Sequence, residues 1–142
     1  MWRWRLGAAV LVMSLCGCSA VFPDQHQSDE DLSRNKGIAA DLNDQWKGMP
    51  GVSSLSARYV DDADNNNQMR VDARCQDCDT EKLADQLVGD IWASQLSPLS
   101  NISVQVYDET ADKSTLRAFT MSSDEHELHE KYGARPEGTT SK

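Results

Sequence analysis

The sequence predicts an α+β fold in which two tandem helix–strand–strand units form a four-stranded, mainly antiparallel sheet with both helices on one face. Apolar residues recur with the period of a helix in two segments, about 31–47 and 80–96. After each of these segments, apolar and polar residues alternate in two shorter segments, as in half-buried strands. One such unit cannot bury its own apolar face, whereas two units side by side can.

The two helices are expected at about Asp31–Lys47 and Thr80–Leu96. Acidic residues at 29–31 suit a helix N-terminus, and Gly48 should end the first helix. The second helix has a wider apolar face, with Asp79 or Thr80 as its cap. The two apolar faces consist of Ile38, Leu42, Trp46 and Met49 in the first helix and of Leu83, Leu87, Val88, Ile91 and Trp92 in the second.

Four segments alternate as strands do, two after each helix, and the turn-rich segment 61–67 should join the first two as a hairpin. The side chains expected to face the helices are Leu55, Ala57 and Tyr59; Met69, Val71 and Ala73; Ile102, Val104 and Val106; and Leu116, Ala118 and Thr120. A sequence repeat supports this choice of inward-facing residues, because a shift of 47 residues aligns Met69 with Leu116. At a shift of 46 residues Trp46 aligns with Trp92, and both are expected to be core anchors.

The same phase places Tyr107, Phe119 and Met121 on the sheet face opposite the helices. If that face is uncovered, these side chains form an apolar patch that could bind a partner. If the polar C-terminal tail, residues 122–142, folds over the face through Leu128 and Tyr132, they belong to the core instead. A short helix is expected within this tail.

The N-terminus has the pattern of a secretory signal. Arg3 and Arg5 precede an apolar run from Leu6 to Leu15, and small residues follow. A run of ten residues, at about 1.5 Å per residue, is too short to cross a hydrocarbon core of about 30 Å. We therefore expect residues 1–17 to be removed from the mature protein.

The end of this run, Leu15-Cys16-Gly17-Cys18, resembles the lipobox of bacterial membrane lipoproteins: an aliphatic residue, a small residue, Gly and Cys. The resemblance implies cleavage before Cys18 and attachment of diacylglycerol, with palmitate-type acyl chains, to the Cys18 thiol. Two acyl chains give stable anchoring where one does not. The implied localisation is the cell membrane, facing outside the cytoplasm. An ordinary signal, with Cys18 in a disulfide, is the alternative.

Processing at Cys18 leaves residues 18–30 as a flexible tether and residues 31–121 as the folded domain. Because residues 1–17 contain two arginines and no acid, the mature chain carries 12 Lys and Arg against 23 Asp and Glu. Such an acidic chain repels nucleic acid, which excludes a nucleic-acid function.

Cys75-Gln76-Asp77-Cys78 lies between a predicted strand and a predicted helix. A thiol near a helix N-terminus has a lowered pKa, so a thiol–disulfide redox site is one hypothesis. The acids Asp77 and Asp79 oppose a thiolate, and the helix–strand–strand order differs from the βαβ unit of thioredoxin-like enzymes. An exported protein also meets an oxidising compartment. These arguments favour a structural disulfide.

His126, His129 and Glu130 form a second cluster with ligand chemistry. Their spacing would place them on one helix face, but a solvated tail helix is the favoured interpretation, so neither a metal nor a cofactor is expected. No nucleophile elbow, phosphate loop or catalytic triad is found. The sequence thus predicts a lipid-anchored, non-catalytic envelope protein with a protein-interaction or structural role, and a membrane-tethered thiol–disulfide protein as the alternative.

Overall fold

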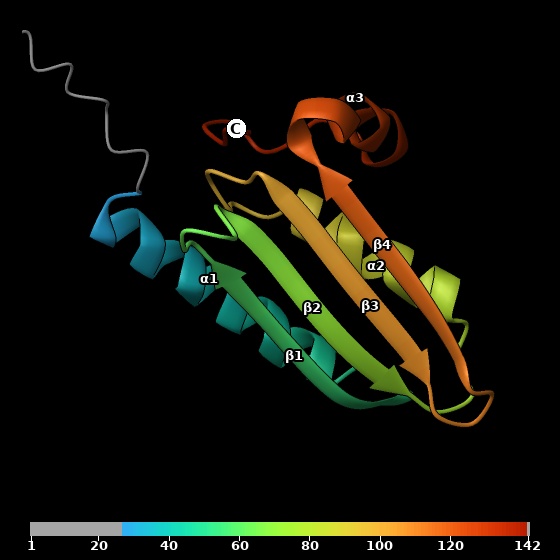
Figure 1. The fold of residues 1–142 in the computed structure, drawn as a ribbon. Coiled ribbons are helices and arrows are strands. Elements are labelled where there is room, and N and C mark those ends of the chain that lie inside the picture. Colours follow the sequence, from blue (N-terminus) through green and yellow to red (C-terminus); the bar gives the residue numbers. More distant parts are fainter. Residues whose placement is uncertain (1–26, 142) are drawn as a thin grey trace, which may run out of the picture.

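The computed structural model describes residues 27–141, so the N-terminal segment with Cys18 and most of the predicted tether lie outside the described residues. The helices are α1 (Asp29–Lys47), α2 (Thr80–Trp92) and α3 (Met121–Tyr132). The strands are β1 (Val52–Val60), β2 (Gln68–Cys75), β3 (Asn101–Asp108) and β4 (Lys113–Thr120). They form one sheet with helices packed on one face, and the expected α+β class is confirmed (Figure 1).

The strands follow one another in the sheet in chain order, β1-β2-β3-β4. β1 pairs with β2 and β3 with β4 in antiparallel hairpins, whereas β2 and β3 are parallel. The two outer strands therefore run in one direction and the two central strands in the other. Parallel neighbours need a crossover connection, and α2 provides it between β2 and β3.

Side chains cap both main helices at their N-termini. Ser28 accepts a hydrogen bond from the backbone N–H of Asp31 at 3.2 Å, and three acids occupy the first turn of α1. Asp79 accepts hydrogen bonds at 3.1 Å from the backbone N–H groups of Glu81 and Lys82. These contacts satisfy amides that have no partner within the helix, which explains why α1 and α2 begin where they do.

The core lies between the sheet and the helix layer. It contains the expected inner residues of β1, β2 and β3 and the whole apolar face of α2. Trp46 of α1 is fully buried, and its indole Nε1 donates to Asp90 Oδ2 of α2 at 2.8 Å. The first helix–strand–strand unit is thereby joined to the second by a charge-assisted hydrogen bond as well as by apolar contact.

The predicted phase of β4 is wrong. Leu116 is 60% exposed, whereas Thr115 is buried and Phe119 packs against the core. The register explains the difference: Tyr59 pairs with Met69, ten residues later, but Val106 pairs with Thr115, nine residues later. A change of one residue in a hairpin connection reverses the face on which every following side chain lies. The repeat thus holds for three strands and fails at the fourth.

α3 packs beside α2 at the end of β4 and does not cover the other face of the sheet (Figure 1). Its Leu128 is fully buried, and the indole of Trp92 donates to the carbonyl oxygen of Gly133 at 2.7 Å. Asp85 of α2 lies 3.0 Å from both Lys131 of α3 and Arg117 of β4. Burial raises the pKa of Asp85, but the hydrogen bonds from these two cations outweigh it and the pKa is lowered.

The edge of the sheet at β1 is partly occupied by α1, because Asn43 Oδ1 accepts a hydrogen bond from the backbone N–H of Ala57 at 3.0 Å. Within residues 27–141, no helix combines the length and the apolar character needed to span a membrane.

Candidate functional site

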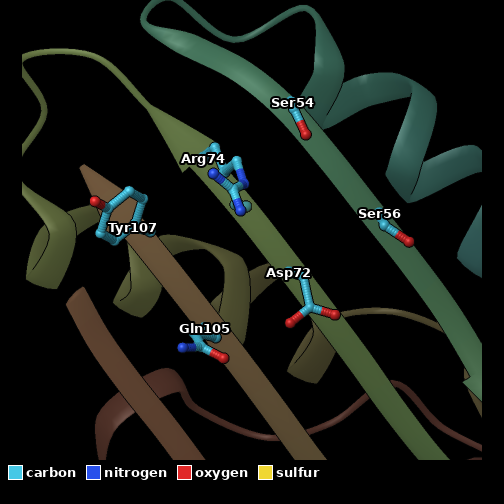
Figure 2. A pocket seen from close by; sticks show the side chains of 7 residues that line it. Ser54, Ser56, Asp72, Arg74, Gln105 and Tyr107 are labelled. Carbon is cyan, nitrogen blue, oxygen red and sulfur yellow. The ribbon is translucent and has the colours of Figure 1, made fainter. Parts of the chain in front are cut away.

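The sheet face that points away from α1 and α2, here called the open face, is formed by side chains that are exposed or half-buried. In its middle, Ser56, Asp72 and Gln105 lie side by side on β1, β2 and β3. They line a shallow hollow of about 430 Å³ together with Ser54, Arg74 and Tyr107 (Figure 2). The hollow is therefore polar, with hydroxyl, carboxylate, amide and guanidinium groups projecting from three strands.

Four charged residues project from the strands on the open face: Arg58, Arg70, Asp72 and Arg74. Their sum is positive in a chain whose formal net charge is −9. Arg74 is already engaged, since its guanidinium lies 3.5 Å from Glu109 Oε1 and 5.6 Å from the centroid of the Tyr107 ring.

Arg58 and Arg70 are directly opposite each other in the β1–β2 hairpin. The Arg70 guanidinium donates to two amide oxygens, Asn65 Oδ1 and Gln68 Oε1, each at 3.3 Å. In the part of the chain that the structure describes, neither arginine forms a salt bridge. Like charges directly opposite each other destabilise a strand pair, so the fold itself gains nothing from this arrangement.

Of the three residues expected to form an apolar patch, only Tyr107 lies on the open face. Phe119 pairs with Ile102 on the helix side, and Met121 begins α3 and is 2% exposed, so the prediction of one shared exposed face is wrong. The one-residue change in the β3–β4 connection is the physical reason. The hydroxyl of Tyr107 donates to Asp112 Oδ1 at 2.7 Å, and this hydrogen bond raises the pKa of Tyr107.

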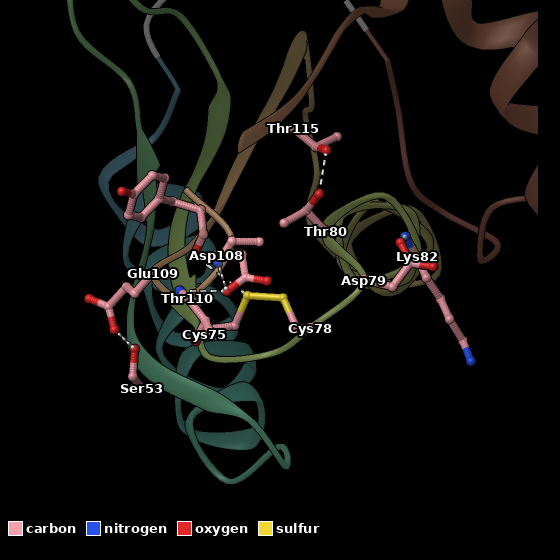
Figure 3. Close-up of a disulfide and its surroundings, with 12 residues drawn as sticks. Ser53, Cys75, Cys78, Asp79, Thr80, Lys82, Asp108, Glu109, Thr110 and Thr115 are labelled. Carbon is pink, nitrogen blue, oxygen red and sulfur yellow. Dashed lines mark hydrogen bonds between the residues drawn. A yellow bond between two sulfur atoms is a disulfide. The ribbon is translucent and has the colours of Figure 1, made fainter. Parts of the chain in front are cut away.

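The second candidate is the corner where β2 ends and α2 begins (Figure 3). The structure joins Cys75 and Cys78 in a disulfide, with 6.0 Å between their Cα atoms. Cys75 is fully buried and Cys78 is half-buried. Backbone hydrogen bonds hold the corner from two sides, from Gln76 N–H to the Gly51 carbonyl and from Glu109 N–H to the Cys75 carbonyl, each at 2.9 Å.

Asp108 stands beside the disulfide on β3 and is 3% exposed. Its carboxylate accepts hydrogen bonds from the backbone N–H groups of Thr110 at 2.9 Å and Ala111 at 3.3 Å. The hydrogen bond from Thr110 is the main cause that lowers the pKa of Asp108, and the backbone of Ala111, Cys78 and Asp77 lowers it further against the opposing effect of burial. The carboxylate thus stays charged next to the two sulfurs.

One argument against a redox role does not survive, because β2, α2 and β3 do form a βαβ unit with parallel strands. The surroundings of the sulfurs still oppose a reactive thiolate. Burial of Cys75 and the negative charge of Asp108 both disfavour a thiolate at this position. The corner therefore has the position of a redox motif but the environment of a structural disulfide.

The tail histidines lie on α3, far from either candidate in the chain. His126 Nε2 is 3.3 Å from Glu130 Oε1, and both side chains are largely exposed. Among residues 27–141, no group of three or more His, Cys, Asp or Glu side chains could hold a metal ion. His129 lines a separate hollow next to Trp92 and Arg135.

Two site features were missed by the sequence reasoning. The opposition of Arg58 and Arg70 depends on the exact register of a hairpin with a seven-residue loop, which the alternation of apolar residues leaves open. Asp108 was available as a signal, since an Asp at the end of a strand commonly accepts hydrogen bonds from the turn that follows.

Comparison of the chain with protein-family models, with curated proteins and with solved structures found no match.

Proposed function

We propose that this protein is a lipid-anchored, non-catalytic lipoprotein of the bacterial cell envelope, and that its open face is a protein-interaction surface. The observation that carries the proposal is the polar hollow, with Arg58 and Arg70 on the same sheet face, on a side of the sheet that α1, α2 and α3 leave uncovered. The side chains that build the hollow come from three strands of one sheet, so the surface is rigid and needs little ordering when a partner binds.

The anchor rests on Leu15-Cys16-Gly17-Cys18, which lies outside the described residues. Diacylglycerol on Cys18 would place the domain about a dozen tether residues from the membrane, a reach of roughly 20 Å. The test is the intact mass of the protein from a membrane fraction. We expect a chain that starts at Cys18 and carries diacylglycerol, whereas a chain without lipid would contradict the anchor.

The interaction surface is tested separately, by placing a photo-crosslinking amino acid at Gln105 or at Gln86 in cells. Both positions are exposed, but Gln105 lines the open face and Gln86 lies on α2. We expect a discrete protein adduct from Gln105 and none of the same mass from Gln86. Equal adducts from both positions, or none from Gln105, would contradict the proposal.

A thiol–disulfide exchange function is the second candidate, because Cys75 and Cys78 join β2 to α2 within a βαβ unit. The burial of Cys75 favours the structural role instead. Alkylation after treatment with dithiothreitol at graded potentials separates the two. A disulfide that stays oxidised until the potential falls below that of known thiol–disulfide exchange proteins supports the structural role. Reduction within the range of those proteins would support exchange.

A further inference from the structure

We propose that Arg58 and Arg70 form the anion-binding centre of the open face, and that the partner it takes is an acidic segment of another protein. This inference rests on the function proposed above and names the chemistry of the partner.

The first step of the argument is the pairing itself. Arg58 and Arg70 occupy directly opposite positions in a hairpin, a placement that costs stability when both carry charge. Side chains at directly opposite positions start from Cβ atoms about 4.5–5.5 Å apart, and each guanidinium offers parallel N–H donors that match the two oxygens of a carboxylate. The hydrogen bonds of Arg70 to Asn65 and Gln68 orient its guanidinium without neutralising it. The arrangement is therefore costly in the free protein and complementary to a bound anion.

The second step is the charge around the pair. The loop 61–67 at one end of the strands carries Asp61, Asp62 and Asp64, and the turn 109–112 at the other end carries Glu109 and Asp112. The positive charge is thus a narrow band between two acidic borders. A broad anionic surface such as a membrane would meet both borders, whereas a single extended segment can lie across the strands between them.

The third step is the hollow beside the pair. Asp72 projects into it next to Arg70 on the same strand and has no salt bridge among the described residues. Asp72 repels carboxylates and accepts hydrogen bonds, while Ser56 and Gln105 beside it can donate and accept. The partner segment should accordingly place a carboxylate over Arg58 and Arg70 and a neutral donor group over Asp72.

The test uses the full processed chain in neutral detergent and a capped hexaglutamate peptide as the probe, with hexaglutamine as the uncharged comparison. Binding is followed by the NMR signals of the arginine Nε–H groups. We expect Arg58→Gln and Arg70→Gln each to weaken hexaglutamate binding by about fivefold, and Asp72→Asn to strengthen it.

Two variants on the helix side change the net charge of the chain by the same amounts. Lys82→Gln on α2 matches the arginine variants, and Asp41→Asn on α1 matches Asp72→Asn; both side chains are exposed. We expect either variant to change binding by less than about twofold, because salt screens charges more than about 10 Å apart. If binding followed net charge alone, so that Lys82→Gln equalled Arg58→Gln, the proposed site would be refuted.

The membrane alternative is tested with the lipidated protein in nanodiscs of phosphatidylcholine alone or mixed with phosphatidylglycerol. Shifts of the Arg58 and Arg70 signals that require phosphatidylglycerol would overturn the acidic-segment proposal in favour of lipid headgroups. If the Gln105 crosslink persists unchanged in an Arg58→Gln/Arg70→Gln chain, the arginine site is wrong while the proposed function stands. If hexaglutamate binding shows the expected charge order but Gln105 yields no adduct, the anion site is upheld and the partner function fails.

Discussion

Leu116 and Met69 should respond very differently to truncation, although they occupy equivalent positions in the sequence repeat. Met69 is fully buried between the sheet and the helices, and Leu116 is 60% exposed on the open face. Replacing a buried Met by Ala usually costs about 2–5 kcal/mol, because apolar contact is lost and a cavity remains. Full burial of a Leu side chain is worth about 2 kcal/mol, so a Leu that keeps less than half of its burial should cost less than about 1 kcal/mol on truncation.

The measurement is urea unfolding of the full chain with the disulfide intact, followed by the fluorescence of the buried Trp46 and Trp92. We expect Met69→Ala to lower the free energy of unfolding by at least about 2 kcal/mol and Leu116→Ala by less than about 1 kcal/mol. Phe119→Ala, a half-buried residue on the helix side of the same strand, serves as a second comparison. Equal losses for Met69→Ala and Leu116→Ala, together with a small loss for Phe119→Ala, would refute the register of β4.

Three further predictions concern the polar contacts of the core and the corner. Trp46→Phe removes the donor to Asp90 and should lower the free energy of unfolding by about 2–3 kcal/mol in urea, and the loss should be smaller in an Asp90→Ala background, which has no acceptor for the indole. The pKa of Asp108 is lowered in the folded state, so its carboxylate stabilises the fold at pH values above the ordinary Asp pKa, near 4. This stabilisation is lost as the pH falls below that value. Asp108→Asn should therefore make the free energy of unfolding fall less steeply between pH about 6 and 2. The disulfide closes a loop of only four residues, so Cys75→Ser/Cys78→Ser should lower the free energy of unfolding by about 2 kcal/mol, measured by thermal unfolding. The double variant should still give the Gln105 crosslink. Loss of the crosslink would contradict a purely structural role for the disulfide.

Much of the layer structure could be predicted from the chain. The apolar faces of α1 and α2 and of three strands follow from periods of 3.6 and 2, which depend only on local geometry. The face of β4 could not be obtained this way, because it depends on how many residues the β3–β4 connection uses. Extending the repeat from Met69 to Leu116 assumed the same pairing in both hairpins, but Tyr59 pairs with a residue ten positions later and the equivalent Val106 with a residue nine positions later.

The candidate site was harder to predict for a related reason. Cys75 and Cys78 are recognisable from spacing alone, whereas the Arg58–Arg70 pair exists only in one hairpin register. The parallel neighbours β2 and β3 also bring Cys75 next to Asp108, residues that are far apart in the sequence. Long-range register, rather than local pattern, determines which polar groups meet.

The contact between Asn43 and the backbone of Ala57 has a consequence for assembly. An outer strand presents unpaired N–H and C=O groups on which another chain can add a strand. At β1 one of these N–H groups is already bound by a helix side chain, so an incoming strand would have to break that bond before it could pair along the full edge. The hydrogen bond to this one amide therefore protects the β1 edge against edge-to-edge aggregation without placing a charged residue there. Such protection would matter most if the proposed lipid anchor concentrates copies of the chain on a membrane surface.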